Sequence, residues 1–162
     1  MRRSIALLGL TLILAVVAAF AATPAMANGC TPGFWKNRAV KLELYNEEAT
    51  VASVFASAPA SVAGDSLLEA LSYGGGSTLL AKQKILLRAA VAGWLNYTVQ
   101  GPGVYWTQFS GAFGADGEQY TVAEYVGLVN SALLSTSESD ILLLASHIDI
   151  KNNEHAADSI CS

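Results

Sequence analysis

The spacing of hydrophobic residues in the second half of the chain predicts amphipathic helices. In residues 121–134 and again in residues 137–152, apolar side chains recur every third or fourth position, which places them on one face of a helix. The predicted inward positions are Val122, Tyr125, Val126, Val129, Ala132 and Leu133 in the first segment, and Ile141, Leu144, Ala145 and Ile148 in the second. Thr121 with Glu124 has the pattern of a capping box, and Ser137 followed by Asp140 is predicted to begin the last helix.

Residues 78–98 are predicted to form the longest helix, and almost every position in its middle is apolar. A helix that is apolar nearly all the way around is surrounded by other helices. Its polar positions, which fall at multiples of four, are Lys84, Arg88 and Asn96. The pattern therefore predicts one narrow exposed stripe, with Leu87 and Val91 in the core on the opposite face.

The region before the long helix contains a capping residue and a helix stop signal. Asp65 is predicted to cap a short helix that runs through Tyr73, because its side chain can accept a hydrogen bond from the first turn. Three consecutive glycines at 74–76 end this helix, and Ser77 is predicted to cap the long helix that follows.

Residues 38–56 leave two interpretations open. Apolar and polar residues alternate over positions 40–45, which is typical of a strand, whereas Asn46 before two glutamates is typical of a helix N-terminus. We interpret the stretch as mostly helical. Further upstream, Pro32 and Gly33 suit the two central positions of a type II turn.

Together these segments predict an all-α fold, a single small bundle of four to five helices around a central helix at about residues 78–98. No internal repeat or linker divides the chain, so residues 28–162 are expected to form one domain. Residues 100–120 contain five glycines and one proline, and this composition predicts a long loop.

Residues 1–27 have the three parts of a cleavable signal peptide. A pair of arginines supplies the positive start, an apolar run follows over residues 5–22, and Ala-Met-Ala at 25–27 matches a cleavage site. The alternative is a retained membrane anchor, since the apolar run approaches the length that spans a bilayer. Pro24 and the Ala-x-Ala sequence favour cleavage after Ala27, which predicts a secreted protein, with the periplasm and the cell surface left open.

The charge balance narrows the classes of partner. Nine Lys and Arg residues stand against thirteen Asp and Glu, and seven of those nine remain once Arg2 and Arg3 are removed with the signal peptide. The mature chain then has 135 of the 162 residues and a net charge of −6. Nucleic acids and anionic membrane surfaces need Lys and Arg to neutralise phosphates, so the sequence excludes them as expected partners.

The two cysteines are predicted to form one disulfide. Cys30 lies near the start of the mature chain and Cys161 near its end, and two thiols in an oxidising compartment are expected to pair. Such a bond would tie down both termini, which otherwise fray. The aromatic residues Phe34 and Trp35 are expected to pack over it.

The segment Cys30-Thr31-Pro32-Gly33-Phe34-Trp35-Lys36-Asn37 resembles the opening motif of a group of secreted bacterial proteins, in which Cys-Thr-Pro-Gly-(Tyr/Phe)-Trp-Lys-Asn begins the mature domain. Parts of the predicted helices, at residues 66–71, 86–92 and 121–130, are similar as well. The group has no assigned reaction or ligand. The resemblance therefore implies secretion and the type of domain, but it implies no active site.

No catalytic constellation can be identified in the sequence. His147 and His155 are eight residues apart, which separates them by about 12 Å along a helix, too far to share one metal ion. His147 lies near Asp149, but a histidine on an amphipathic helix is the simpler interpretation. Carboxylates are plentiful and no pair stands out as a general acid and base, so no catalytic residue, cofactor or metal ligand is assigned.

Two acidic stretches are weak calcium candidates. Residues 149–158 are rich in oxygen ligands but fail the EF-hand pattern, because Lys151 stands at the third position and Ile160 at the twelfth. Asp116 and Glu118 form the second candidate. Asn96-Tyr97-Thr98 has the form of a glycosylation sequon, but inside a helix it is expected to pack.

The aromatic residues of the long loop form the binding site that we predict from the sequence. Tyr105, Trp106 and Phe109 lie among glycines, and exposed aromatic rings stack on sugar faces or anchor a protein partner. The alternative is that these rings fold inward and close the bundle.

The sequence thus predicts a secreted, non-enzymatic structural or interaction domain of a cell surface, an extracellular matrix or a self-assembling fibre. Its partners would be an extracellular protein, a glycan or a second copy of the chain, with no membrane anchor after signal cleavage. A carbohydrate-binding module that uses the loop aromatics is the alternative, and an undescribed hydrolase is the third hypothesis.

Overall fold

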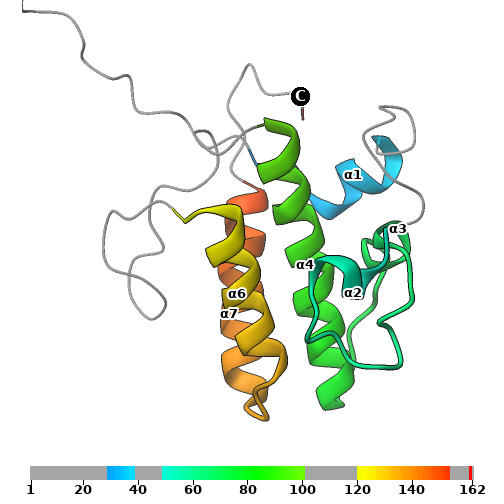
Figure 1. The fold of residues 1–162 in the computed structure, drawn as a ribbon, viewed down its shortest axis with the longest axis vertical. Helices are drawn as coiled ribbons and strands as arrows, with labels where there is room; N and C mark the ends of the chain where they lie inside the picture. The colour runs from blue at the N-terminus through cyan, green and yellow to red at the C-terminus, as the bar shows by residue number, and fades with distance from the viewer. Residues whose placement is uncertain (1–28, 39–48, 101–119, 154–160, 162) are drawn as a thin grey trace, which may run out of the picture.

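The computed structural model of the chain describes residues 29–38, 49–100, 120–153 and 161 (Figure 1). Within these ranges the fold is helical, and the only β-pairing is one isolated bridge between Thr50 and Ser66. The helices are α1 (Pro32–Arg38), α2 (Val51–Val54), α3 (Leu67–Ala70), α4 (Leu79–Gln100), α6 (Val122–Leu133) and α7 (Glu138–Asn152). The all-α prediction is confirmed, with a long helix at the predicted place.

The bundle is built around α4, which has the most extensive interface with α7. α6 and α7 lie together on one side of α4, and the segment that contains α2 and α3 lies on the other side (Figure 1). α4 and α7 run in the same direction, and α6 runs antiparallel to both of them (Figure 1). α1 packs against α4 near the end where α4 and α7 finish.

The core consists of the apolar faces that the sequence predicts for the three long helices. Fully buried leucine, isoleucine and valine side chains from α4, α6 and α7 include Leu86, Leu87, Val91, Val129, Ile141, Leu144 and Ile148. Leu87 and Val91 are 0% exposed, as the helical pattern predicts. Because α4 buries residues in nearly every direction, it is the central element of the fold.

A glycine allows α6 to approach α4 closely. The hydroxyl of Tyr125 donates a hydrogen bond to the Ala90 carbonyl oxygen at 2.9 Å, so the ring crosses the surface of α4. A Cβ atom at Gly93 would overlap the Tyr125 hydroxyl and lie 3.1 Å from the Cζ atom of the same ring. Position 93 therefore requires glycine for reasons of space.

The helix caps confirm some predictions and correct others. Thr121 with Glu124 forms the predicted capping box, and Ser137 caps α7. The cap of α3 is Ser66, in a capping box with Glu69, and not Asp65. The prediction for Asp65 was wrong because its carboxylate accepts a hydrogen bond from the Tyr73 hydroxyl at 2.6 Å instead.

Two further local predictions were wrong. The side chain that accepts a hydrogen bond in the first turn of α4 is that of Thr78, from the Ala81 amide at 3.2 Å, and not that of Ser77. Pro32 and Gly33 begin α1 rather than form a type II turn. Proline is well suited to the first position of a helix, because the amide hydrogen that it lacks has no partner there.

The region interpreted as mostly helical is described only in part. Residues 39–48 lie outside the described ranges, so the choice between strand and helix is untested there. Immediately after them, Thr50 caps the short helix α2 through a hydrogen bond from the Ser53 amide. The predicted long loop at 100–120 also lies almost wholly outside the described residues.

Candidate functional site

The predicted disulfide is confirmed. Cys30 and Cys161 are bonded, with their Cα atoms 5.4 Å apart and a sequence separation of 131. This Cα separation is in the usual range for disulfides. The bond fixes the segment that leads into α1 at the end of the bundle where α4 and α7 finish.

Asn96 of α4 lies at the centre of a buried polar network beside this disulfide. Its Oδ1 atom accepts hydrogen bonds from the Cys30 amide at 2.9 Å and from Trp35 Nε1 at 3.0 Å. Its Nδ2 group donates to the Cys30 carbonyl oxygen and to Asn152 Oδ1, both at 3.0 Å. All four hydrogen-bonding positions of this amide are therefore used.

This network corrects the predicted polar stripe on α4. Asn96 is 0% exposed rather than solvent-facing, because α1 and α7 cover that side of the helix. The sequon asparagine consequently has its Nδ2 group engaged in the interior, in agreement with the expectation that it packs. Lys84 and Arg88 are only partly buried, so the stripe divides into one buried residue and two partly accessible residues.

Asn152 extends the network from α4 to α7. Its Nδ2 group donates to the Ala89 carbonyl oxygen of α4 at 2.9 Å, while its Oδ1 atom accepts from Asn96. Gly29 passes directly over the end of α7, where a Cβ atom would overlap the Lys151 carbonyl oxygen and lie 2.8 Å from the Asn152 Cα atom. The chain before α1 is thus packed tightly against both long helices.

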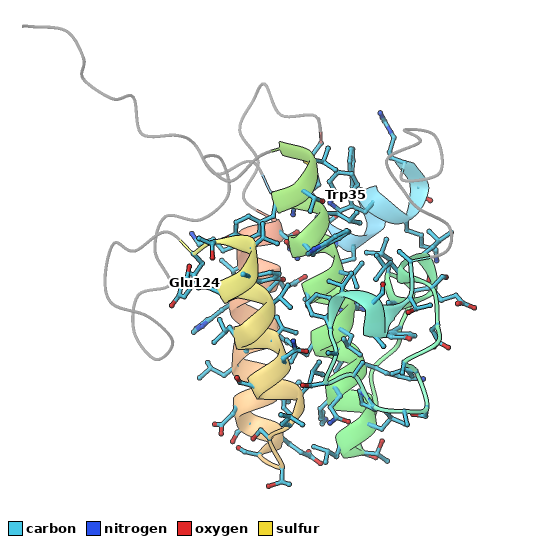
Figure 2. All side chains as sticks on the ribbon, viewed as in Figure 1. Trp35 and Glu124 are labelled. Carbon is cyan, nitrogen blue, oxygen red and sulfur yellow. A yellow bond between two sulfur atoms is a disulfide. The ribbon has the colours of Figure 1, made fainter. Side chains whose placement is uncertain are left out.

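The aromatic pair of the opening motif completes this end of the bundle. Trp35 is fully buried and lies between α1 and α4 (Figure 2). Its ring meets that of Phe34 edge to face at 5.3 Å, and the Arg38 guanidinium lies 5.4 Å from the centre of the Phe34 ring. The expectation that both rings pack at the disulfide end is confirmed for Trp35, and Phe34 is packed against the core while partly exposed.

An open cleft with both polar and apolar walls lies next to this network. It has a volume of about 440 Å³, within the range of small-molecule sites. Its walls come from the start of α1, the end of the α3 segment, the middle of α4 and the end of α7. The lining residues are Thr31, Pro32, Gly33, Lys36, Leu71, Ser72, Tyr73, Arg88, Asp149 and Asn153.

Charged side chains from three helices face this cleft. Lys36 of α1 and Arg88 of α4 are cations, and Asp149 of α7 is the single carboxylate among the lining residues that the structure describes. These described residues give the cleft one surplus positive charge, in a chain whose net charge is −4. Anionic groups are attracted to such a local surplus.

Arg88 has few hydrogen-bond partners in the protein. Its Nη1 group approaches the Tyr73 carbonyl oxygen at 3.5 Å, the upper limit for a hydrogen bond, and its buried Nε group has no partner among the described residues. A guanidinium offers five N–H donors. Most of the donors of Arg88 are thus unused by the described part of the chain.

Tyr73 lines the cleft, and its hydroxyl is protonated and held in place by a hydrogen bond to Asp65. Burial raises the pKa of its hydroxyl above the ordinary range, and the hydrogen bond to Asp65 raises that pKa further. The Lys84 ammonium lies 5.1 Å from the centre of the ring, at the distance of a cation–π contact. The hydroxyl is consequently a donor to Asp65 rather than an acid or base for chemistry.

The described residues of the cleft offer groups for binding and contain no recognisable pair for acid–base chemistry. No histidine or cysteine is among the lining residues in the described part of the chain. Hydrolysis of a glycoside in the usual way needs two carboxylates, and the described lining contributes one. Hydroxyl, amide, ammonium and guanidinium groups that surround a small volume are instead typical of a site that recognises a polar ligand.

The binding hypothesis of the sequence is untested by the structure. Tyr105, Trp106 and Phe109 lie outside the described residues, as does His155. His147 lies on α7 and is partly buried. The aromatic loop site therefore stays a prediction.

The calcium candidates are likewise mostly outside the described ranges. Asp116, Glu118 and residues 154–158 belong to undescribed segments. Where the structure describes the chain, no three His, Cys, Asp or Glu side chains gather in a way that could hold a metal ion. Asn152, an oxygen ligand of the first candidate, is used in the network with Asn96.

Sequence reasoning missed the cleft because its three charged residues are far apart in the chain. Lys36, Arg88 and Asp149 belong to α1, α4 and α7, and each by itself is an ordinary surface residue of its helix. One signal was available for the neighbouring network. Asn96 stands between the apolar residues Leu95 and Tyr97, and the position one turn earlier is Ala92, so the stripe was not polar throughout.

Comparisons with protein-family models, with curated proteins and with solved structures found no match to this chain.

Proposed function

We propose that this chain is an exported interaction domain that binds a polar ligand in the cleft between α1, α4 and α7. The observation that carries the proposal is the composition of the cleft. Side chains that donate and accept hydrogen bonds converge on it from several helices, and the described lining residues include no paired nucleophile and base.

Export is supported by the disulfide and by the signal-like pattern at 1–27. Disulfides persist in oxidising compartments and are rare in the cytosol. A bond between residues separated by 131 positions also stabilises a small domain, through the entropy that it removes from the unfolded chain. Among the helices that the structure describes, none has the length and apolar character needed to cross a membrane.

Rigid walls favour a binding role for the cleft. Thr31 and Lys36 flank Trp35 and Cys30, which are hydrogen-bonded to Asn96 of α4. Asn153 follows Asn152, which is hydrogen-bonded to the Ala89 carbonyl oxygen next to Arg88. Walls that are fixed before the ligand arrives reduce the entropy lost on binding.

The proposal is tested with residues 28–162 produced by export and purified with the disulfide intact. We expect saturable co-sedimentation with at least one insoluble polymer of cell walls or extracellular matrices, and no release of soluble products. An Asp149→Asn variant is the check on chemistry. Turnover of a polymer that disappears in this variant would contradict the proposal and indicate a hydrolase.

The same assay separates the cleft from the aromatic loop. Arg88→Gln removes one of the two cations that line the cleft, and the double change Tyr105→Ala with Trp106→Ala removes two rings of the loop. We expect Arg88→Gln to weaken co-sedimentation and the double variant to retain it. The reverse result would favour the carbohydrate-binding module predicted from the loop aromatics.

A further inference from the structure

The charge of the cleft specifies the charge of a ligand that would fit it. Among the described lining residues, Lys36 and Arg88 supply two positive charges and Asp149 one negative charge, which leaves a surplus of one. A ligand with a single negative charge balances this surplus. A zwitterion brings no net charge, and a phosphate dianion brings more than the cleft neutralises.

The geometry of Arg88 favours a planar anion. A guanidinium presents its donors as a flat fork that matches the two oxygens of a carboxylate. No ion pair within 4.0 Å joins Arg88 to a carboxylate in the described part of the chain. Its only hydrogen bond there is the 3.5 Å contact with the Tyr73 carbonyl oxygen, so a ligand oxygen would meet little competition.

The remaining polar groups of the cleft suit a ligand that also carries hydroxyls. Thr31 and Ser72 contribute hydroxyl groups, and Asn153 contributes an amide. The Asp149 carboxylate accepts hydrogen bonds, and it repels a second anionic group near the end of α7. A molecule with one carboxylate and several hydroxyls fulfils all of these conditions.

On the basis of the proposed function, we propose that the cleft binds a hexuronic acid, with its carboxylate on Arg88 and Lys36 and its hydroxyls toward Asp149 and Asn153. The ligand is a single acidic sugar residue, either free or within a polysaccharide. Arg88 is the specificity-determining residue, because it offers the planar fork.

The test is a calorimetric titration of the disulfide-intact mature chain with D-glucuronate. D-glucose is the neutral counterpart, L-alanine the zwitterion and inorganic phosphate the dianion. We expect saturable binding of glucuronate and at least about tenfold weaker binding of glucose, which lacks the charge-assisted hydrogen bonds. Tighter binding of alanine would overturn the proposal in favour of an amino acid or peptide terminus, and tighter binding of phosphate would overturn it in favour of a phosphorylated ligand.

Matched variants locate the binding. Arg88→Gln and Lys82→Gln each remove one positive charge from α4, and Lys82 does not line the cleft. We expect Arg88→Gln to weaken glucuronate binding by about tenfold or more, with Lys82→Gln close to wild type. Equal effects of the two variants, or the absence of glucuronate binding to the wild type, would overturn the proposal. Thermal melts establish that each variant is folded.

The outcome can be separated from that of the proposed function. If glucuronate fails to bind while the domain still co-sediments with a polymer in an Arg88-dependent way, the ligand class is wrong and the binding cleft stands. If co-sedimentation also fails or does not depend on Arg88, the proposed function is wrong as well.

Discussion

The two ends of the bundle are stabilised by different interactions. Where α4 and α7 finish, two asparagines and a tryptophan N–H are buried in one hydrogen-bonded network beside the disulfide. At the opposite end, where α6 turns into α7, Leu133 is buried and its neighbour Leu134 is 73% exposed. A polar contact at that end is the hydrogen bond from the Gln83 side chain to the Leu133 carbonyl oxygen at 2.8 Å.

Because of this difference, we expect a substitution to change the stability of the protein differently at the two ends. Apolar packing is non-directional, and its loss costs an amount that depends on the area and cavity left behind. A buried polar network is directional, and the removal of one member leaves its partners buried without hydrogen bonds. The end with the network should therefore be the more sensitive to a single change.

The largest effect is expected for Asn96→Leu. The change keeps side-chain size similar, but it leaves the Cys30 amide and the Trp35 indole N–H without their acceptor, and the Cys30 carbonyl oxygen and Asn152 Oδ1 without their donor. Since each unsatisfied buried group costs about 1–3 kcal/mol, we expect a loss of more than about 4 kcal/mol in the free energy of unfolding. Urea denaturation measures it.

Asn130→Leu is the matched control for this prediction. Asn130 lies on α6, is partly buried, and accepts a hydrogen bond from the Ser57 amide at 3.0 Å. We expect a loss of about 1 kcal/mol for this variant. Equal losses for the two asparagines would contradict the distinction between a network and a single hydrogen bond.

The next effect is expected for removal of the disulfide. Replacement of Cys30 and Cys161 together by serine should lower the free energy of unfolding by about 2–5 kcal/mol, because the unfolded chain regains the entropy of an open loop. Denaturation of the variant beside the wild type measures this loss. Intact-mass analysis after alkylation should find no reactive thiol in the exported wild-type protein, and two alkylated thiols would disprove the bond.

Two adjacent residues on α4, Leu87 and Arg88, test how much apolar packing contributes to stability. Leu87 is 0% exposed, so Leu87→Ala should lower the free energy of unfolding by about 2–5 kcal/mol through lost burial and a cavity. Arg88→Gln, one position further, should change it by less than about 1 kcal/mol, since the described residues give Arg88 only one long hydrogen bond. Indistinguishable thermal melts would show that the buried face of α4 is assigned incorrectly.

The smallest effect is expected at an exposed polar contact, the capping box of α6. Glu124 lies at the outer surface (Figure 2) and accepts hydrogen bonds from the Thr121 amide at 2.7 Å and the Thr121 hydroxyl at 2.8 Å. The amide hydrogen bond, followed by that of the hydroxyl, lowers the pKa of the Glu124 carboxyl. The ionised form is therefore the one that stabilises the fold.

The lowered pKa of Glu124 determines how its contribution to stability depends on pH. A carboxyl whose pKa is lowered by folding stabilises the protein above its unfolded pKa of about 4.3, and the contribution is lost as the pH falls through the folded pKa. We expect Glu124→Gln to lower the melting temperature slightly near neutral pH, and the difference from wild type to shrink on acidification. A difference that grows with acidification would refute the assigned role.

The sequence was most informative where neighbouring residues decide the structure. The Thr121–Glu124 box depends on contacts three residues apart, and the inward faces of α6 and α7 follow from a period of 3.6 residues. Local competition explains the errors. Asp65 and Ser66 are both good caps, and Asp65 was unavailable because Tyr73, eight residues on, holds its carboxylate.

The sequence by itself determined the three long helices, the inward faces of α6 and α7 and the pairing of two cysteines, because periodicity, caps and the number of thiols are local or countable properties. Only the tertiary structure decided that Asn96 is fully buried and Arg88 only partly, although both lie on the same predicted stripe. The physical reason is the position of other segments. The Cys30–Trp35 segment and Asn152 supply Asn96 with a partner for every hydrogen-bonding atom, whereas at Arg88 the walls of three helices stay apart and leave a cleft.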